Sequence, residues 1–171
     1  DIVVELSSYS RTATNEYRTT IDLPRIIEDA LLLVERSAPV DGVSFTIDLP
    51  EKAFVHARTN EIQQVFVNLI KNAAEAVIER FEGASGGEVI IRAGLEGEQV
   101  WATVSDNGSG IPDDKRSIIF DPFYTTKPPG KGTGLGLNVV YRILTKYRGT
   151  ITVESEPNRG TTFHLKIPVS S

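Results

Sequence analysis

Apolar and polar residues alternate in several short segments of this sequence, on both sides of a long helical segment. Such alternation is typical of strands that bury one face, because successive side chains point to opposite sides of a sheet. The expected strands are residues 43–49, 53–57, 88–95, 99–105, 150–154 and 161–168. We expect 53–57 to pair with 43–49, and a tight turn at 96–98 to make a hairpin of the next two strands.

The segments between these strands carry apolar residues at helical spacing. The expected helices span residues 22–37, 60–80 and 135–147, with a shorter helical piece near 113–119. Asp22 and Asn60 are expected to cap the first two, and Gly149 to end the third. This order predicts an α/β fold, a two-layer sandwich in which helices cover one face of a mixed sheet of about five strands.

The composition suits one domain and excludes several kinds of function. The 171 residues include no cysteine, which excludes disulfides and cysteine-bound zinc. The formal net charge of -5 argues against a nucleic-acid partner, since such proteins normally carry a basic face. No apolar run reaches the ~20 residues of a membrane span, so we expect a cytoplasmic domain whose longer parent could still be membrane-anchored.

A polar stripe runs along the expected helix 60–80, beside its apolar face. Asn68 and Asn72 lie one turn apart on this stripe. Asparagine is a poor helix former, and its side-chain oxygen is a hard, neutral ligand that suits Mg²⁺. The pattern is compatible with a magnesium site, and equally with a solvated helix face.

A glycine-rich segment, Asp106-Asn-Gly108-Ser-Gly110, follows the expected strand 99–105 directly. A carboxylate at a strand end can accept a hydrogen bond from the exocyclic amine of adenine, where guanine presents a carbonyl. The glycines would let a flat base lie against the backbone. An ordinary glycine-rich turn is the alternative.

Two further segments precede the helix 135–147. They read Phe120-Asp-Pro-Phe-Tyr-Thr-Thr-Lys127 and Gly132-Thr-Gly-Leu-Gly-Leu137. Glycines ahead of a helix leave backbone N–H groups free to hold phosphate oxygens, although the sequence contains neither a Walker A motif nor a Rossmann fingerprint. Residues 121–133 are expected to form a mobile lid, and a surface loop without a ligand is the alternative.

Together and in this order, these segments resemble the ATP-binding catalytic domain of two-component sensor histidine kinases, whose Bergerat-type fold is shared with gyrase B and MutL. The resemblance covers about residues 22–168. The matching segments are 68–76 (N box), 106–110 (G1 box), 120–123 (F box), 132–137 (G2 box) and 160–163 (closing strand).

The resemblance implies ATP and Mg²⁺ as cofactors. It makes Asn72 the magnesium ligand and Asp106 the residue that reads adenine, in a pocket shaped by Gly108 and Gly110 and completed by Thr161. The other nucleotide-binding residues that we expect are Phe120, Lys127, Lys131, Gly132, Thr133, Gly134, Leu135, Gly136 and Leu137.

Asn68 and Lys71 are the expected catalytic residues of the N box. Lys71 would contact phosphate, and a solvated lysine is the alternative. Clamp-type ATPases of the same fold carry, one turn before the magnesium asparagine, a glutamate that activates water. Because Asn68 stands there and cannot act as a carboxylate base, the sequence favours a kinase over a hydrolase or a non-catalytic nucleotide-binding module.

The histidine that such a kinase phosphorylates lies on a dimerising helical hairpin. The two histidines here, His56 and His164, fall on expected strands and are expected to be structural. Residues 1–19 are expected to be a remnant of the hairpin, and 20–171 the catalytic domain. The implied partners are the hairpin of the same kinase, within a full-length homodimer, and a downstream response regulator.

Overall fold

A five-stranded mixed sheet and three helices dominate the computed structural model, which describes residues 17–130 and 132–169. The sheet order is β2-β4-β5-β7-β6, in which β2 runs parallel to β4 and the other neighbours are antiparallel. The strands are β2 (Val43–Asp48), β4 (Gly87–Glu96), β5 (Gln99–Asp106), β6 (Thr150–Glu156) and β7 (Gly160–Pro168).

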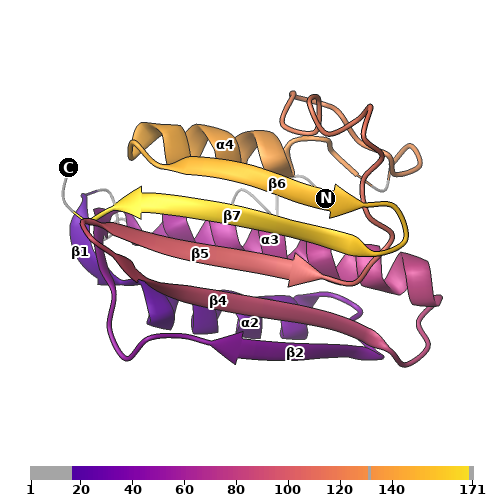
Figure 1. The fold of residues 1–171 in the computed structure, drawn as a ribbon, viewed down its shortest axis with the longest axis horizontal. Coiled ribbons are helices and arrows are strands. Elements are labelled where there is room, and N and C mark those ends of the chain that lie inside the picture. Colours follow the sequence, from indigo (N-terminus) through magenta and orange to yellow (C-terminus); the bar gives the residue numbers. More distant parts are fainter. Residues whose placement is uncertain (1–16, 131, 170–171) are drawn as a thin grey trace, which may run out of the picture.

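The helices all lie on one face of this sheet (Figure 1). They are α2 (Leu23–Ser37), α3 (Thr59–Phe81) and α4 (Gly136–Lys146). The two-layer α/β sandwich expected from the sequence is therefore confirmed. The C-terminal ends of β5 and β6 and the start of α4 meet at one end of the molecule, where the glycine-rich loops also lie (Figure 1).

A separate two-stranded sheet corrects one sequence prediction. Strand β3 (Phe54–Ala57) pairs antiparallel with β1 (Thr19–Asp22), and not with residues 43–49. The Leu23 N–H donates to the Ala53 carbonyl at 2.7 Å, and the Ala53 N–H donates to Asp22 Oδ1 at 3.2 Å, which ties the two strands together. Alternation shows which face of β3 is buried but not which strand is its partner. Of the expected hairpin remnant at 1–19, residues 1–16 lie outside the described residues, and Thr19 belongs to β1.

Helix capping also differs from the prediction. Asp22 occupies the N-cap position of α2, but its side chain makes no capping bond there. Arg58 and not Asn60 is the N-cap of α3, and its carbonyl accepts the N–H groups of Glu61 and Ile62 at 3.2 Å. Residues 113–119 form consecutive turns instead of a helix.

Helix α3 forms the centre of the core. It packs against α2, α4 and the sheet. Its buried residues are Ile62, Val65, Phe66, Leu69, Ile70, Ala73, Ala74 and Val77. The polar stripe beside this face is held rigidly, because the helix that carries it is buried along most of its length. Among the described residues, no helix combines the length and apolar character needed to cross a membrane.

Candidate functional site

Asp106 lies at the end of β5, next to Thr161 on β7. Its Oδ1 accepts the Gly108 N–H at 2.8 Å, and its carboxylate also accepts the Thr161 N–H. Burial raises the pKa of Asp106 to about 6, and these two hydrogen bonds only partly oppose that rise. The structure thus holds a half-buried carboxylate in a fixed orientation, as a hydrogen-bond acceptor for a ligand requires.

Gly108 and Gly110 are required because the loop that carries them passes closely between α3 and the β6–β7 turn. A Cβ at Gly108 would lie 2.5 Å from the Ala76 carbonyl carbon on α3. Gly110 has φ +74°, and a Cβ there would lie 2.2 Å from the Glu156 carbonyl oxygen. The Ser109 N–H donates to the Ala76 carbonyl at 3.1 Å. The glycines therefore fix the loop against α3 on one side and the β6–β7 turn on the other.

Ser155 joins this end of the site, although the sequence analysis gave it no role. Its hydroxyl lies 2.8 Å from the buried Thr161 hydroxyl and accepts the Ile111 N–H at 2.7 Å. The register that places Ser155 opposite Thr161 was the missing signal, because it depends on the β6–β7 pairing. A hollow of about 340 Å³ opens here, lined by Asp106, Arg116, Glu154, Ser155, Glu156, Arg159, Gly160, Thr161 and Thr162.

Asn68, on the polar stripe, faces the start of α4. Asn68 Nδ2 donates to the Gly136 carbonyl at 3.4 Å, so the N-box helix and the last glycine of the G2 segment are in contact. Asn72 is half-buried one turn further along α3, whereas Lys71 is exposed. The structure therefore brings Asn68 and Gly136 together, whereas the exposed Lys71 takes no part in this contact.

The loop between Phe120 and Gly136 reaches back to α3. The Lys127 ammonium forms an ion pair with the Glu75 carboxylate, on the polar stripe. The stem of Lys127 lies against Gly132, where a Cβ would be 2.9 Å from the lysine Cδ. Glu75, like Ser155, had no role predicted for it from the sequence. Lys131 is outside the described residues.

The remaining residues of the G2 segment shape the loop. Gly134 has φ +67°, and a Cβ there would lie 2.3 Å from the Phe123 carbonyl carbon. The Thr133 hydroxyl accepts the Leu135 N–H at 3.3 Å. These contacts fold the loop onto itself just before α4 begins. Leu137 is half-buried in the first turn of that helix.

The Phe120 ring packs between α4 and the sheet. Its ring centroid lies 6.0 Å from that of Tyr141 and 6.3 Å from that of Phe163. Its carbonyl accepts the side-chain N–H of Asn138 at 3.0 Å. Phe120 thus anchors the beginning of the loop to α4, which limits how far the loop can move away.

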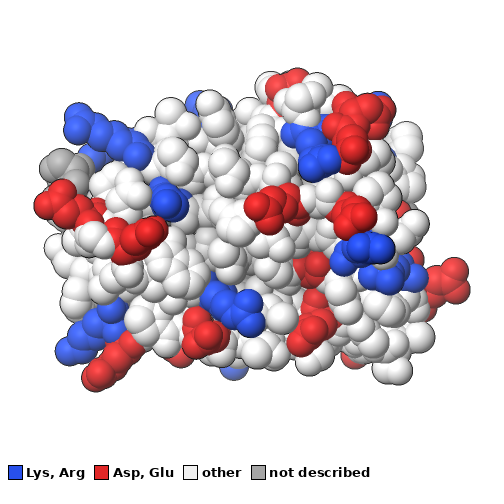
Figure 2. All heavy atoms as spheres, in the orientation of Figure 1, with Lys and Arg blue, Asp and Glu red and all other residues white. Residues whose placement is uncertain are grey.

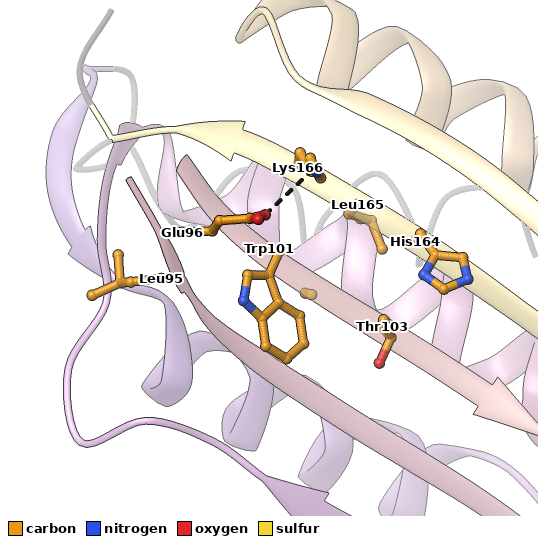
Figure 3. A pocket seen from close by; sticks show the side chains of 8 residues that line it. Leu95, Glu96, Trp101, Thr103, His164, Leu165 and Lys166 are labelled. Atoms are coloured by element: carbon orange, nitrogen blue, oxygen red, sulfur yellow. Dashed lines mark hydrogen bonds and ion pairs between the residues drawn. The ribbon is translucent and has the colours of Figure 1, made fainter. Parts of the chain in front are cut away.

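A larger hollow, of about 430 Å³, lies on the open face of the sheet (Figure 3). Its walls include Trp101 on β5 and His164 on β7. His164 Nε2 lies 3.4 Å from Glu154 Oε2. Acidic and basic side chains are interspersed over this face (Figure 2). The loops and the polar stripe described above lie elsewhere, so this hollow is separate from the candidate site.

The fold is a mixed sheet with helices on one face. An acidic strand end and a helix that carries asparagines lie next to a glycine-rich loop. Together these features define a class of ATP-binding domain. The chain belongs to the family described as histidine kinase-, DNA gyrase B- and HSP90-like ATPases, which matches residues 57–171. The family expected from the sequence motifs is confirmed.

The relatives found are sensor kinases. Sporulation kinase A of Bacillus subtilis (strain 168) is 34% identical over 168 residues, which are 98% of this chain and 26% of that protein. The catalytic domain of histidine kinase ThkA superposes with a TM-score of 0.76 at 30% identity, covering 90% of this chain and 96% of that one. ThkA in complex with the response regulator protein TrrA gives a TM-score of 0.72 at 27% identity, covering 98% of this chain and 46% of that one. The chain spans between 18% and 35% of the length of eight curated relatives that it matches, so it corresponds to a part of each of them.

Proposed function

We propose that this chain binds Mg-ATP and transfers the γ-phosphoryl group to a histidine on a dimerising helical hairpin, as the catalytic domain of a two-component sensor kinase. The observation that carries the proposal is the position of Asn68. Its side-chain amide donates to the Gly136 carbonyl at the start of α4. A clamp-type hydrolase needs a carboxylate base at the position that Asn68 occupies. A kinase needs no such base, because its nucleophile is an imidazole.

The adenine would bind at the Asp106 end of the site. The ionised carboxylate accepts a hydrogen bond from the adenine amine, and Gly108 N–H keeps the carboxylate oriented. Thr161 and Ser155 supply hydroxyl groups beside it. Guanine carries a carbonyl where adenine carries its amine, so Asp106 would select adenine over guanine.

The phosphates would bind at the start of α4, where the G2 segment exposes backbone N–H groups at a helix N-terminus. Asn72 fits a magnesium ligand, because it offers a hard amide oxygen one turn from Asn68, which contacts Gly136. Magnesium, when bound, neutralises phosphate charge. The protein contributes mainly positioning and electrostatic stabilisation, which is general for phosphoryl transfer.

The partners follow from the relatives. Since ThkA is described in complex with a response regulator, we propose that the phosphoryl group passes from the hairpin histidine to an aspartate of a regulator. We also propose that the hairpin comes from the same kinase and makes the full-length protein a homodimer. His56 and His164 are not acceptors in this scheme, since each lies on a strand.

Nucleotide titration by calorimetry tests the proposal. The chain should bind ATP at least tenfold more tightly than GTP. Asp106→Asn should lose about 1.5–3 kcal/mol of ATP binding, which is roughly ten- to hundredfold in affinity. Asp41→Asn, an exposed carboxylate in the turn before β2, is the matched control and should bind as the parent does. Equal binding of GTP, or full ATP affinity in Asp106→Asn, would contradict the assignment.

A further inference from the structure

The ion pair between Lys127 and Glu75 connects the loop to the central helix. Glu75 lies three residues after Asn72 on the polar stripe of α3, and Lys127 is 52 residues later in the chain. Both side chains are about one-third exposed, at 34% and 37%. The pair is therefore a long-range contact that fixes the loop on α3, and water can still reach it.

The position of the lysine stem adds to this contact. Lys127 packs against Gly132, the first glycine of the segment proposed to hold the phosphates. The ammonium of Lys127 therefore lies between a carboxylate on α3 and a segment proposed to receive a polyphosphate. A phosphate group and the Glu75 carboxylate compete for the same cation, and they also repel each other when both are close.

We propose that Glu75 is a positioning residue that holds Lys127, and with it the loop, against α3 while no nucleotide is bound. Phosphates take Lys127 from Glu75 when ATP binds. Glu75 thereby orders the loop in the free protein and lowers its affinity for ATP. The proposal rests on the function proposed above for the site, and it assigns to Glu75 a role distinct from that of the metal ligand Asn72.

An ion pair of this kind is weak enough for Lys127 to leave Glu75 and contact a phosphate instead. Partly exposed ion pairs are weak, and their loss changes an equilibrium constant by roughly two- to fivefold. The triphosphate carries several negative charges and can outcompete a single carboxylate for Lys127. A pair that was fully buried would resist this exchange, because breaking it would leave an uncompensated charge.

Hydrogen exchange in the nucleotide-free protein tests the first half of the proposal. Glu75→Gln should increase exchange in peptides of residues 121–130 by roughly two- to fivefold, because the pair is lost. Glu79→Gln removes the same charge one turn further along α3. It is the control, since a glutamine oxygen can still accept the bond from the Ser109 hydroxyl that Glu79 accepts at 2.9 Å. Unchanged exchange in Glu75→Gln, or an equal increase in both variants, would overturn the proposal.

Calorimetric titration with ATP tests the second half. Glu75→Gln should bind ATP roughly three- to tenfold more tightly than the parent, with Glu79→Gln closer to the parent. The charge swap Glu75→Lys with Lys127→Glu should restore slow exchange in the free loop but bind ATP more weakly than the parent, because the loop then presents a carboxylate to the phosphates in place of Lys127. A contact with only a structural role would leave the swapped variant with the parent's ATP affinity. An affinity in Glu75→Gln no higher than in Glu79→Gln would also overturn the proposal.

These measurements separate the two proposals. If the parent chain does not bind ATP while Glu75→Gln still increases loop exchange, the proposed function fails and the contact with Lys127 stands. If the parent binds ATP and Glu75→Gln alters neither exchange nor affinity, the function stands and the role of Glu75 fails.

Discussion

Asp106 Oδ1 accepts the backbone N–H of Gly108, two residues further along the chain, at 2.8 Å. The bond closes a small turn at the end of β5 and holds the carboxylate where burial disfavours its charge. The pKa of Asp106 rises from an ordinary value of 3.8 to about 6. The free protein is destabilised by ionising this group, and the function that we propose needs the ionised form.

The first prediction follows from this shift. Between about pH 4 and pH 6 the folded protein retains a proton on Asp106 that the unfolded chain has lost, so this group makes stability fall as pH rises. Above about pH 6 the deficit is constant, at roughly 2–3 kcal/mol. In the absence of nucleotide, Asp106→Asn should therefore be more stable than the parent at pH 7.5, and the difference should shrink toward pH 4. Urea denaturation across this range measures it.

Asp41→Asn is the control for that experiment, because Asp41 is exposed in the turn before β2 and its replacement should change stability by less than about 0.5 kcal/mol at any pH in this range. An Asp106→Asn variant less stable than the parent at pH 7.5 would contradict the prediction, because it would show that the two N–H donors stabilise the carboxylate more than burial destabilises it.

The second prediction concerns the N-terminal end of α3, opposite the end that contacts the Gly108 loop. Tyr147 is buried, donates its hydroxyl hydrogen to Glu61 and accepts the Arg58 N–H at 3.1 Å. Tyr147→Phe leaves the Arg58 N–H without its acceptor and should lower the free energy of unfolding by about 1–3 kcal/mol. Tyr141→Phe removes a hydroxyl from a half-exposed ring on α4, the helix that Tyr147 follows, and should change stability by less than about 0.5 kcal/mol. Equal losses in the two variants would contradict the role of this network.

The third prediction concerns residues 121–133 as a lid. Exchange of their backbone amides should slow on addition of ATP with magnesium, and ADP should slow it less, because ADP lacks the γ-phosphate. Peptides of β2 and the N-terminal half of α2 serve as the internal reference. Equal exchange in the free and ATP-bound protein would remove the lid from the mechanism.

Local patterns predicted most of the fold. Alternation predicted β3 and the five strands of the large sheet, and helical spacing predicted α2, α3 and α4 to within a few residues. Strand β1 was not predicted, so β3 was assigned to the wrong partner; its pairing with β1 depends on tertiary contacts such as Ala53 with Leu23. The capping prediction at Asn60 failed because a polar side chain near a helix start does not reveal which residue adopts the extended N-cap conformation.

The sequence predicted those site residues that can be recognised within one short motif. Motifs identified Asn68, Asp106 and the glycines, and the family is confirmed. Their roles as ligands stay predictions. Ser155 and Glu75 could not be predicted, since each depends on a contact that only the folded chain makes. Ser155 meets Thr161 through the β6–β7 register, and Glu75 meets Lys127 through the folded loop.

Phosphoryl transfer tests the central claim most directly. The chain is mixed with γ-labelled ATP, magnesium and a separate phosphoacceptor hairpin, and acid-labile, base-stable label is measured on each polypeptide. We expect label on the hairpin, slowly because the two are not linked covalently, and none when the hairpin histidine is replaced by glutamine. Asn72→Ala should abolish transfer even where some nucleotide binding survives. Rapid phosphate release by the chain alone with an unlabelled hairpin, or label on His56 or His164, would contradict the account.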